Sequence, residues 1–159
     1  MNWEQVCTDS ALQNLPYKIE INKWGQIIMS PASNRHGMLQ MKIGFLLISL
    51  TKEQGKVISE CSVETHHKTK VADIAWCSSD FIKKHGITTP FPKAPEICIE
   101  IISPSNTSEE MREKRRLYFK AGAKEVWVCN EDGNITFYNQ NKKLRESEMI
   151  PEFPEQIEV

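Results

Sequence analysis

The chain has 159 residues, of which 40% are hydrophobic and 26% are charged. This length and composition fit one globular domain with one hydrophobic core, so we expect residues 1–159 to form a single domain. The formal net charge of −1 provides no overall positive field, so binding to nucleic acid would have to rest on local basic patches or on a metal ion.

The apolar stretches and the cysteines exclude several classes of protein. The longest strongly apolar stretch, near residues 43–50, is too short to span a bilayer, and the first residues lack the pattern of a signal peptide. Five cysteines without a Cys-x-x-Cys pair favour reduced thiols over a disulfide framework or a zinc ribbon. Adjacent His66 and His67 would point to opposite sides of an extended segment, which disfavours a zinc site. We therefore expect a cytoplasmic protein that does not contact membranes.

The first third of the chain predicts a helix, a hairpin and a second, longer helix. Residues 3–12 favour a short helix, which would make residues 1–16 an N-terminal extension of a core at about 17–138. Residues 17–21 and 26–29 predict two strands joined by a turn at 22–25. Pro31 and Ser33 can open a helix that apolar residues continue to Leu50.

The remainder predicts strands with one further long helix among them. Strands are expected at 57–63 and 71–76, then a short helical turn at 81–84 and a strand at 96–102. Strong helix formers predict a helix over 108–121, which Thr107 or a neighbouring polar residue can cap and Gly122 can end. A hairpin at 126–138 follows around an Asp-Gly turn, and residues 139–159 are expected to form a tail. This order of elements indicates a mixed α/β fold with a central mixed sheet flanked by helices.

Glu100 is the residue that fits its surroundings least well. It lies within Ile97-Cys98-Ile99-Glu100-Ile101-Ile102, a run that is otherwise apolar on both faces and is typical of a buried strand. An ionised carboxylate there costs several kcal/mol unless a positive charge or a metal ion neutralises it. The simplest interpretation is an ion pair at the end of the strand.

Two further charged residues occupy positions that should face the interior. Asp73 lies within the apolar strand at 71–76. Lys114 falls on the apolar stripe of the helix at 108–121, between Met111 and Tyr118 on a helical wheel. Two carboxylates that meet at one point repel each other unless a divalent cation lies between them, and Mg²⁺ prefers such oxygen ligands. The three residues predict either a site for phosphodiester hydrolysis or a purely structural charge network.

Segments between about Tyr17 and Tyr138 match one known family. They comprise Lys18-Ile19-Glu20, Gln26 to Pro31, His36-Gly37, Ala72 to Ala75, Pro95 to Ser105, Lys114, Tyr118, Ala121-Gly122 and Glu125-Val126-Trp127. Together they resemble the Uma-type putative restriction endonuclease family of the PD-(D/E)XK nuclease superfamily. The segment Glu-x-x-Ser-Pro-Ser at 100–105, with the lysine, tyrosine and Ala-Gly that follow it, is the most specific part.

The resemblance implies a restriction-endonuclease-like fold and a metal-dependent endonuclease that cuts DNA as a homodimer. By position it implies that Asp73 and Glu100 are catalytic and bind Mg²⁺ or Mn²⁺, that Lys114 is the catalytic lysine, and that Glu20 and His36 line the site. The superfamily's lysine two places after the glutamate is replaced by Ile102, so activity would depend on Lys114. Ala72 and Asn130 also depart from the family pattern without removing an expected ligand.

Two interpretations of function stay open from the sequence. The first is a Mg²⁺-dependent endonuclease that uses these five residues. The second is a catalytically inactive nuclease fold that binds nucleic acid or a protein partner, with Asp73, Glu100 and Lys114 as a structural charge network.

Overall fold

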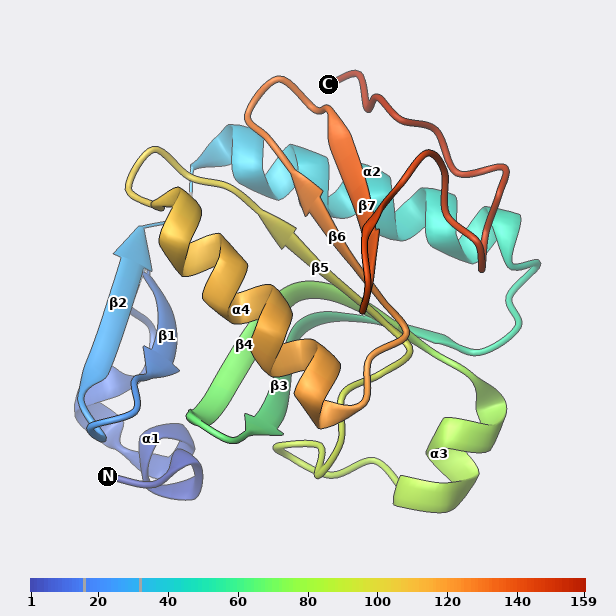
Figure 1. The fold of residues 1–159 in the computed structure, drawn as a ribbon. Helices are drawn as coiled ribbons and strands as arrows, with labels where there is room; N and C mark the ends of the chain where they lie inside the picture. Colours follow the sequence, from blue (N-terminus) through green and yellow to red (C-terminus); the bar gives the residue numbers. More distant parts are fainter. Residues whose placement is uncertain (16, 32) are drawn as a thin grey trace.

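The computed structural model describes residues 1–15, 17–31 and 33–159, and Figure 1 shows their arrangement. A six-stranded sheet with the order β3-β4-β5-β6-β7-β8 forms its centre, and β1 and β2 form a separate two-stranded sheet. The strands are β1 (Tyr17–Ile21), β2 (Ile27–Pro31), β3 (Lys56–Thr65), β4 (Lys68–Cys77), β5 (Ile97–Ile101), β6 (Glu125–Cys129), β7 (Ile135–Asn139) and β8 (Lys143–Leu144). The α-helices are α1 (Trp3–Thr8), α2 (Asn34–Leu50), α3 (Ser79–His85) and α4 (Ser108–Ala121).

The central sheet is mixed, as predicted. Strands β5 and β6 are parallel and are connected through α4, whereas the other neighbouring strands are antiparallel. Helices α2 and α4 lie on opposite faces of this sheet (Figure 1). The α/β class, with a mixed sheet flanked by helices, is therefore confirmed.

Strand β5 is buried on both faces and separates two layers of the core. Ile97, Ile99 and Ile101 belong to the layer beneath α2, whereas Cys98 belongs to the layer beneath α4. Because side chains alternate along a strand, Glu100 projects toward α4 together with Cys98. The odd carboxylate of the sequence thus points at the helix that carries Lys114.

The C-terminal residues extend the core past the boundary that we expected at residue 138. Leu144, Ile150, Phe153 and Ile157 are buried in the α2-side layer, and the ring of Phe153 packs 4.6 Å from that of Trp127 between centroids. The segment also pairs with the β6–β7 turn, where the Ile157 amide donates to the Gly133 carbonyl at 2.8 Å. These apolar residues are widely spaced in a polar segment, so their pattern did not predict burial.

Most predicted elements are present, with changes at their ends. The first helix ends at Thr8 instead of residue 12, because the Asp9 side chain caps a separate 3₁₀ turn at Ser10–Leu12. Helix α4 has the predicted bounds, with Thr107 as its N-cap and Gly122 in a left-handed conformation at its end. Strands β3 and β4 are each longer than predicted. Within residues 1–15, 17–31 and 33–159, none of the helices has the length and apolar character that a membrane span requires.

Candidate active site

The site begins where β4 and β5 separate. Their backbone pairing ends at Ile74 and Ile99, one residue before Asp73 and Glu100 would face each other. Asp73 Oδ2 instead accepts a hydrogen bond from the Ile101 amide at 2.7 Å. A carboxylate therefore takes the place of a backbone acceptor between the strands. This contact fixes Asp73 beside Glu100.

Glu100 is buried and accepts hydrogen bonds from two side chains of α4. The Tyr118 hydroxyl donates to Oε1 at 2.6 Å, and the Lys114 ammonium donates to Oε2 at 3.1 Å. Burial raises the pKa of Glu100, and the positive charges of Lys114 and Lys18 only partly oppose this effect. The positive charges of Lys114 and Lys18 thus favour the ionised form of Glu100, which burial disfavours.

Lys114 faces the core, as its position on the helical wheel predicted. It lies on the buried stripe of α4 with Met111, Leu117 and Tyr118. Its Nζ atom lies 3.0 Å from Glu20 Oε1 and 3.1 Å from Glu100 Oε2. Burial alone would lower the pKa of Lys114, but these carboxylates raise it above the ordinary value, so the side chain stays positively charged.

The β1–β2 hairpin supplies two more charged side chains to the site. Glu20 accepts a hydrogen bond from the Val71 amide at 3.0 Å, in addition to its ion pair with Lys114. Lys18 Nζ lies 2.6 Å from Asp73 Oδ1 and 3.6 Å from Glu100 Oε2. Burial lowers the pKa of Lys18, but the carboxylates of Glu100, Asp73 and Glu20 raise it by more.

Lys18 was absent from the site that we predicted from the sequence. A signal was present, since Lys18 and Glu20 are two residues apart on one strand and therefore share a face. Because Glu20 was expected to line the site, the alternation of side chains along the strand also indicates that Lys18 lines it.

Helix α2 contributes His36 and Gln40 on the other side of Asp73. His36 Nε2 lies 3.4 Å from Asp73 Oδ1, and this hydrogen bond raises the pKa of His36. Gln40, one turn later, donates to the Asp73 backbone carbonyl at 2.7 Å and to Glu60 Oε1 at 2.8 Å. Glu60 and Gln40 were not predicted, because nothing in their sequence neighbourhoods distinguishes them from ordinary surface residues.

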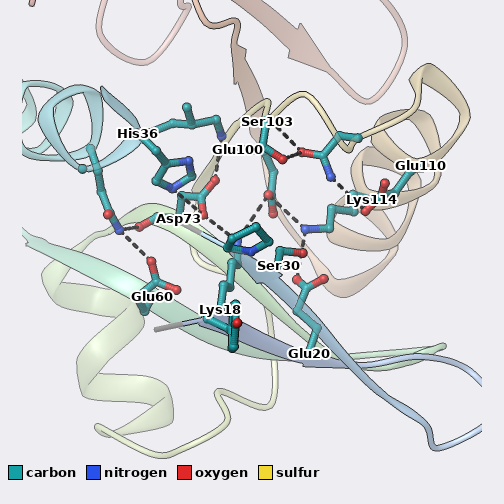
Figure 2. A pocket seen from close by; sticks show the side chains of 16 residues that line it. Lys18, Glu20, Ser30, His36, Glu60, Asp73, Glu100, Ser103, Glu110 and Lys114 are labelled. Carbon is teal, nitrogen blue, oxygen red and sulfur yellow. Dashed lines mark hydrogen bonds and ion pairs between the residues drawn. The ribbon is translucent and has the colours of Figure 1, made fainter. Parts of the chain in front are cut away.

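All five predicted site residues line one cavity of about 220 Å³. Figure 2 shows Asp73, Glu100 and Lys114 around it, with Glu20 and His36 on either side. Further lining residues include Lys18, Glu60, Ser103, Asn106 and Glu110. The structure thus brings together residues from β1, α2, β4, β5 and α4.

The donor atoms of the cavity fit a divalent cation. Asp73 and Glu100, the expected metal ligands, have carboxylate oxygens that already share one ammonium group, that of Lys18. A second group of ligand atoms, from His36, Glu60 and Asp73, lies within 4.8 Å of one another. Carboxylate oxygens suit Mg²⁺ and Mn²⁺, and an imidazole nitrogen is more compatible with Mn²⁺.

The fold and this arrangement place the chain among the α/β proteins with a restriction-endonuclease-like fold. Residues 4–159 match the model of the Uma2 family, described as putative restriction endonuclease, so the chain belongs to this family. A solved structure, that of a putative nuclease belonging to DUF820 from Anabaena variabilis, has a similar fold. It superposes with a TM-score of 0.65 and 20% sequence identity over 76% of this chain and 72% of that chain. A search of curated proteins found no match.

Proposed function

We propose that this protein is a metal-dependent endonuclease that hydrolyses phosphodiester bonds of DNA. One observation carries the proposal. Asp73 and Glu100 lie side by side at the point where β4 and β5 separate, and Lys114 forms an ion pair with Glu100 there. Membership of a family described as putative restriction endonuclease supports a nucleic-acid substrate. Five free cysteines fit the reducing cytoplasm, where such an enzyme would meet DNA.

In this proposal, Asp73 and Glu100 hold Mg²⁺ or Mn²⁺. A bound divalent ion would supply Lewis-acid stabilisation of the phosphate and would lower the pKa of the attacking water. Lys114, held between Glu20 and Glu100, orients that water or stabilises charge on the scissile phosphate. Glu20 acts through Lys114 as a positioning residue, and His36 holds a proton at Nε2 against Asp73 Oδ1.

The test is cleavage of DNA and RNA by the purified protein with Mg²⁺ or Mn²⁺. We expect DNA cleavage that chelation abolishes and that Asp73→Asn and Lys114→Ala each reduce by about a hundredfold or more. Lys23→Ala is the control, because Lys23 is exposed on the turn between β1 and β2. Absence of cleavage, or full activity in the Asp73 and Lys114 variants, would refute the proposal.

The alternative is an inactive nuclease fold that only binds nucleic acid or a protein partner. One observation favours it: Lys18 and Lys114 already neutralise most of the charge of Glu20, Asp73 and Glu100. In that case Lys114→Met would destabilise the protein by about 3–5 kcal/mol whether or not metal is present. A metal site instead predicts that Mn²⁺ raises the melting temperature of the wild-type protein.

The homodimer remains part of the proposal. Helix α2 exposes four large apolar side chains, Met38, Met41, Phe45 and Ile48, which are between 45% and 74% exposed. Their spacing of three, four and three residues is that of a helix–helix seam. This stripe supports a contact between two copies of the chain through α2.

A further inference from the structure

We propose that Lys18 is a built-in counter-cation that occupies the divalent-metal position between Asp73 and Glu100 and must leave when metal binds. Its displacement then sets the metal affinity of the site. This inference rests on the proposed function, because it concerns the same two carboxylates. It assigns a role to Lys18, a residue of a matching segment to which the family resemblance gave none.

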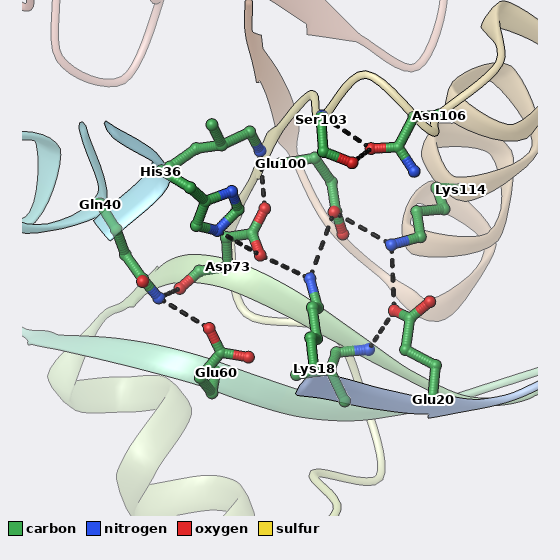
Figure 3. A network of polar contacts seen from close by, with 12 residues as sticks. Lys18, Glu20, His36, Gln40, Glu60, Asp73, Glu100, Ser103, Asn106 and Lys114 are labelled. Atoms are coloured by element: carbon green, nitrogen blue, oxygen red, sulfur yellow. Dashed lines mark hydrogen bonds and ion pairs between the residues drawn. The ribbon is translucent and has the colours of Figure 1, made fainter. Parts of the chain in front are cut away.

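The geometry places the Lys18 ammonium where a shared cation would lie. Nζ is 2.6 Å from Asp73 Oδ1 and 3.6 Å from Glu100 Oε2. Figure 3 shows Lys18 in contact with both carboxylates. A divalent ion bound between the same two carboxylates would lie within a few ångströms of this ammonium group, and the two positive charges repel each other, so the ion has to push the Lys18 ammonium aside. Metal binding is therefore an exchange of one cation for another.

The second lysine of the site has a different pair of partners. Lys114 Nζ bridges Glu20 and Glu100 at 3.0 and 3.1 Å, so its charge remains balanced when Asp73 takes up a new cation. Lys114 also projects from the buried stripe of α4, whereas Lys18 projects from the small β1–β2 hairpin. Lys18 is consequently the lysine that competes with metal at Asp73.

The chemistry of lysine suits this exchange. Its ammonium group is a compact charge on a flexible stem of four methylenes, so Nζ can swing several ångströms without a change in the backbone. The Lys18 side chain is 13% exposed, compared with 7% for Lys114, and it lines the cavity. After displacement, the positive charge would remain at the cavity, close to where an anionic substrate enters.

Removing the Lys18 charge should strengthen metal binding. In Lys18→Met the carboxylates of Asp73 and Glu100 lose their shared cation while the side chain keeps its approximate length. The remaining negative charge attracts a divalent ion more strongly, because no ammonium group a few ångströms away offsets it. We expect the Kd for Mn²⁺ to fall by about tenfold or more.

The experiment measures Mn²⁺ binding by calorimetry and by the loss of the free-ion signal in electron paramagnetic resonance. The proteins are the wild type, Lys18→Met, Asp73→Asn and the control Lys23→Met, whose lysine is exposed on the same hairpin. A lower Kd in Lys18→Met alone, with binding lost in Asp73→Asn, supports the inference. An equal Kd in wild type and Lys18→Met overturns it and leaves the metal site standing. No binding to either protein overturns the proposed metal site, and this inference with it.

A measurement on the wild-type protein covers the case in which Lys18→Met does not fold. Lysine acylation followed by mass spectrometry reports how accessible each ammonium group is. We expect saturating Mg²⁺ to speed the labelling of Lys18 several-fold, with Lys114 and Lys23 unchanged. An unchanged Lys18 rate when Mg²⁺ is bound would overturn the inference.

Discussion

At the scale of single residues, a buried carboxylate outside the site shows what a structural acid looks like in this fold. Glu125 is 1% exposed and accepts hydrogen bonds from the Trp127 indole, the Ser147 hydroxyl and the Glu148 and Met149 amides, all at 2.7–2.9 Å. Every one of these donors is neutral. Glu100 and Asp73 differ from it because their partners include the ammonium groups of Lys18 and Lys114.

We predict that Glu125→Leu destabilises the protein by about 2–4 kcal/mol, because buried donors on Trp127, Ser147 and the backbone lose their acceptor. Urea unfolding, followed by tryptophan fluorescence, measures this change. Ser147→Ala removes only one of the donors and should cost about 1 kcal/mol. A Glu125→Leu protein as stable as the wild type would show that the carboxylate does not hold the C-terminal segment in place.

At the scale of elements, the strands hide most of the thiols. Cys61, Cys77, Cys98 and Cys129 are buried in β3, β4, β5 and β6, whereas Cys7 on α1 is exposed. Burial raises the pKa of Cys61 and of Cys129 to about 12, and burial together with Glu96 raises that of Cys77 to about 11. Burial also raises the pKa of Cys98 and that of Cys7, so it is exposure to solvent that distinguishes Cys7 from the four buried thiols.

This distribution predicts one fast-reacting thiol in the native protein. At pH 8, a disulfide reagent should modify Cys7 within minutes and the other four cysteines only after unfolding in denaturant. Cys7→Ser should abolish the fast phase and leave the slow one intact. Two or more fast thiols would mean that the strands open readily in solution.

The elements were more predictable than their arrangement. The bounds of α4 followed from helix formers between a Thr107 cap and a Gly122 stop, which are local signals. Asp73, Glu100 and Lys114 could be selected because each interrupts an apolar pattern. Lys18 was missed because a lysine in a short hairpin strand is unremarkable by itself. Alternation places Lys18 on the same face as Glu20, but the contact with Asp73 and Glu100 depends on how the β1–β2 hairpin packs beside β4, which local periodicity does not specify.

At the scale of the whole molecule, the exposed stripe of α2 bears on assembly. Helix α2 buries Leu39, Ile43 and Leu47 against the sheet and exposes Met41 and Phe45 on its outer face. Because apolar residues occur all around the helix in the sequence, the pattern did not indicate which of them face the sheet and which face outward. Such exposed apolar groups are typical of interaction surfaces.

We predict that the protein forms a homodimer through this stripe and that Phe45→Glu shifts it to the monomer. A buried glutamate pair at such a contact would cost several kcal/mol, which is enough to raise the dimer Kd by about a hundredfold or more. Light scattering coupled to size exclusion measures the mass. Lys42→Glu, on an exposed neighbouring position, is the control. A wild-type monomer at all concentrations would contradict the prediction.

The hydrogen bond from the Ile101 amide to Asp73 gives this aspartate a second role. The Asp73 side chain accepts the hydrogen bond that a backbone carbonyl would accept in a regular pair of strands. At this point β4 and β5 are therefore joined through a side chain, and their backbones are no longer paired. Asp73, Glu100 and Ile101 line the cavity at the point where β4 and β5 separate. An alanine at position 73 would remove the spacer as well as the charge, so inactivity of that variant would not by itself reveal a metal ligand. Asparagine keeps one oxygen for the Ile101 amide and removes the charge, while its NH2 group replaces the oxygen that Lys18 and His36 contact. It is therefore the substitution that keeps the spacing of the strands and removes the metal ligand.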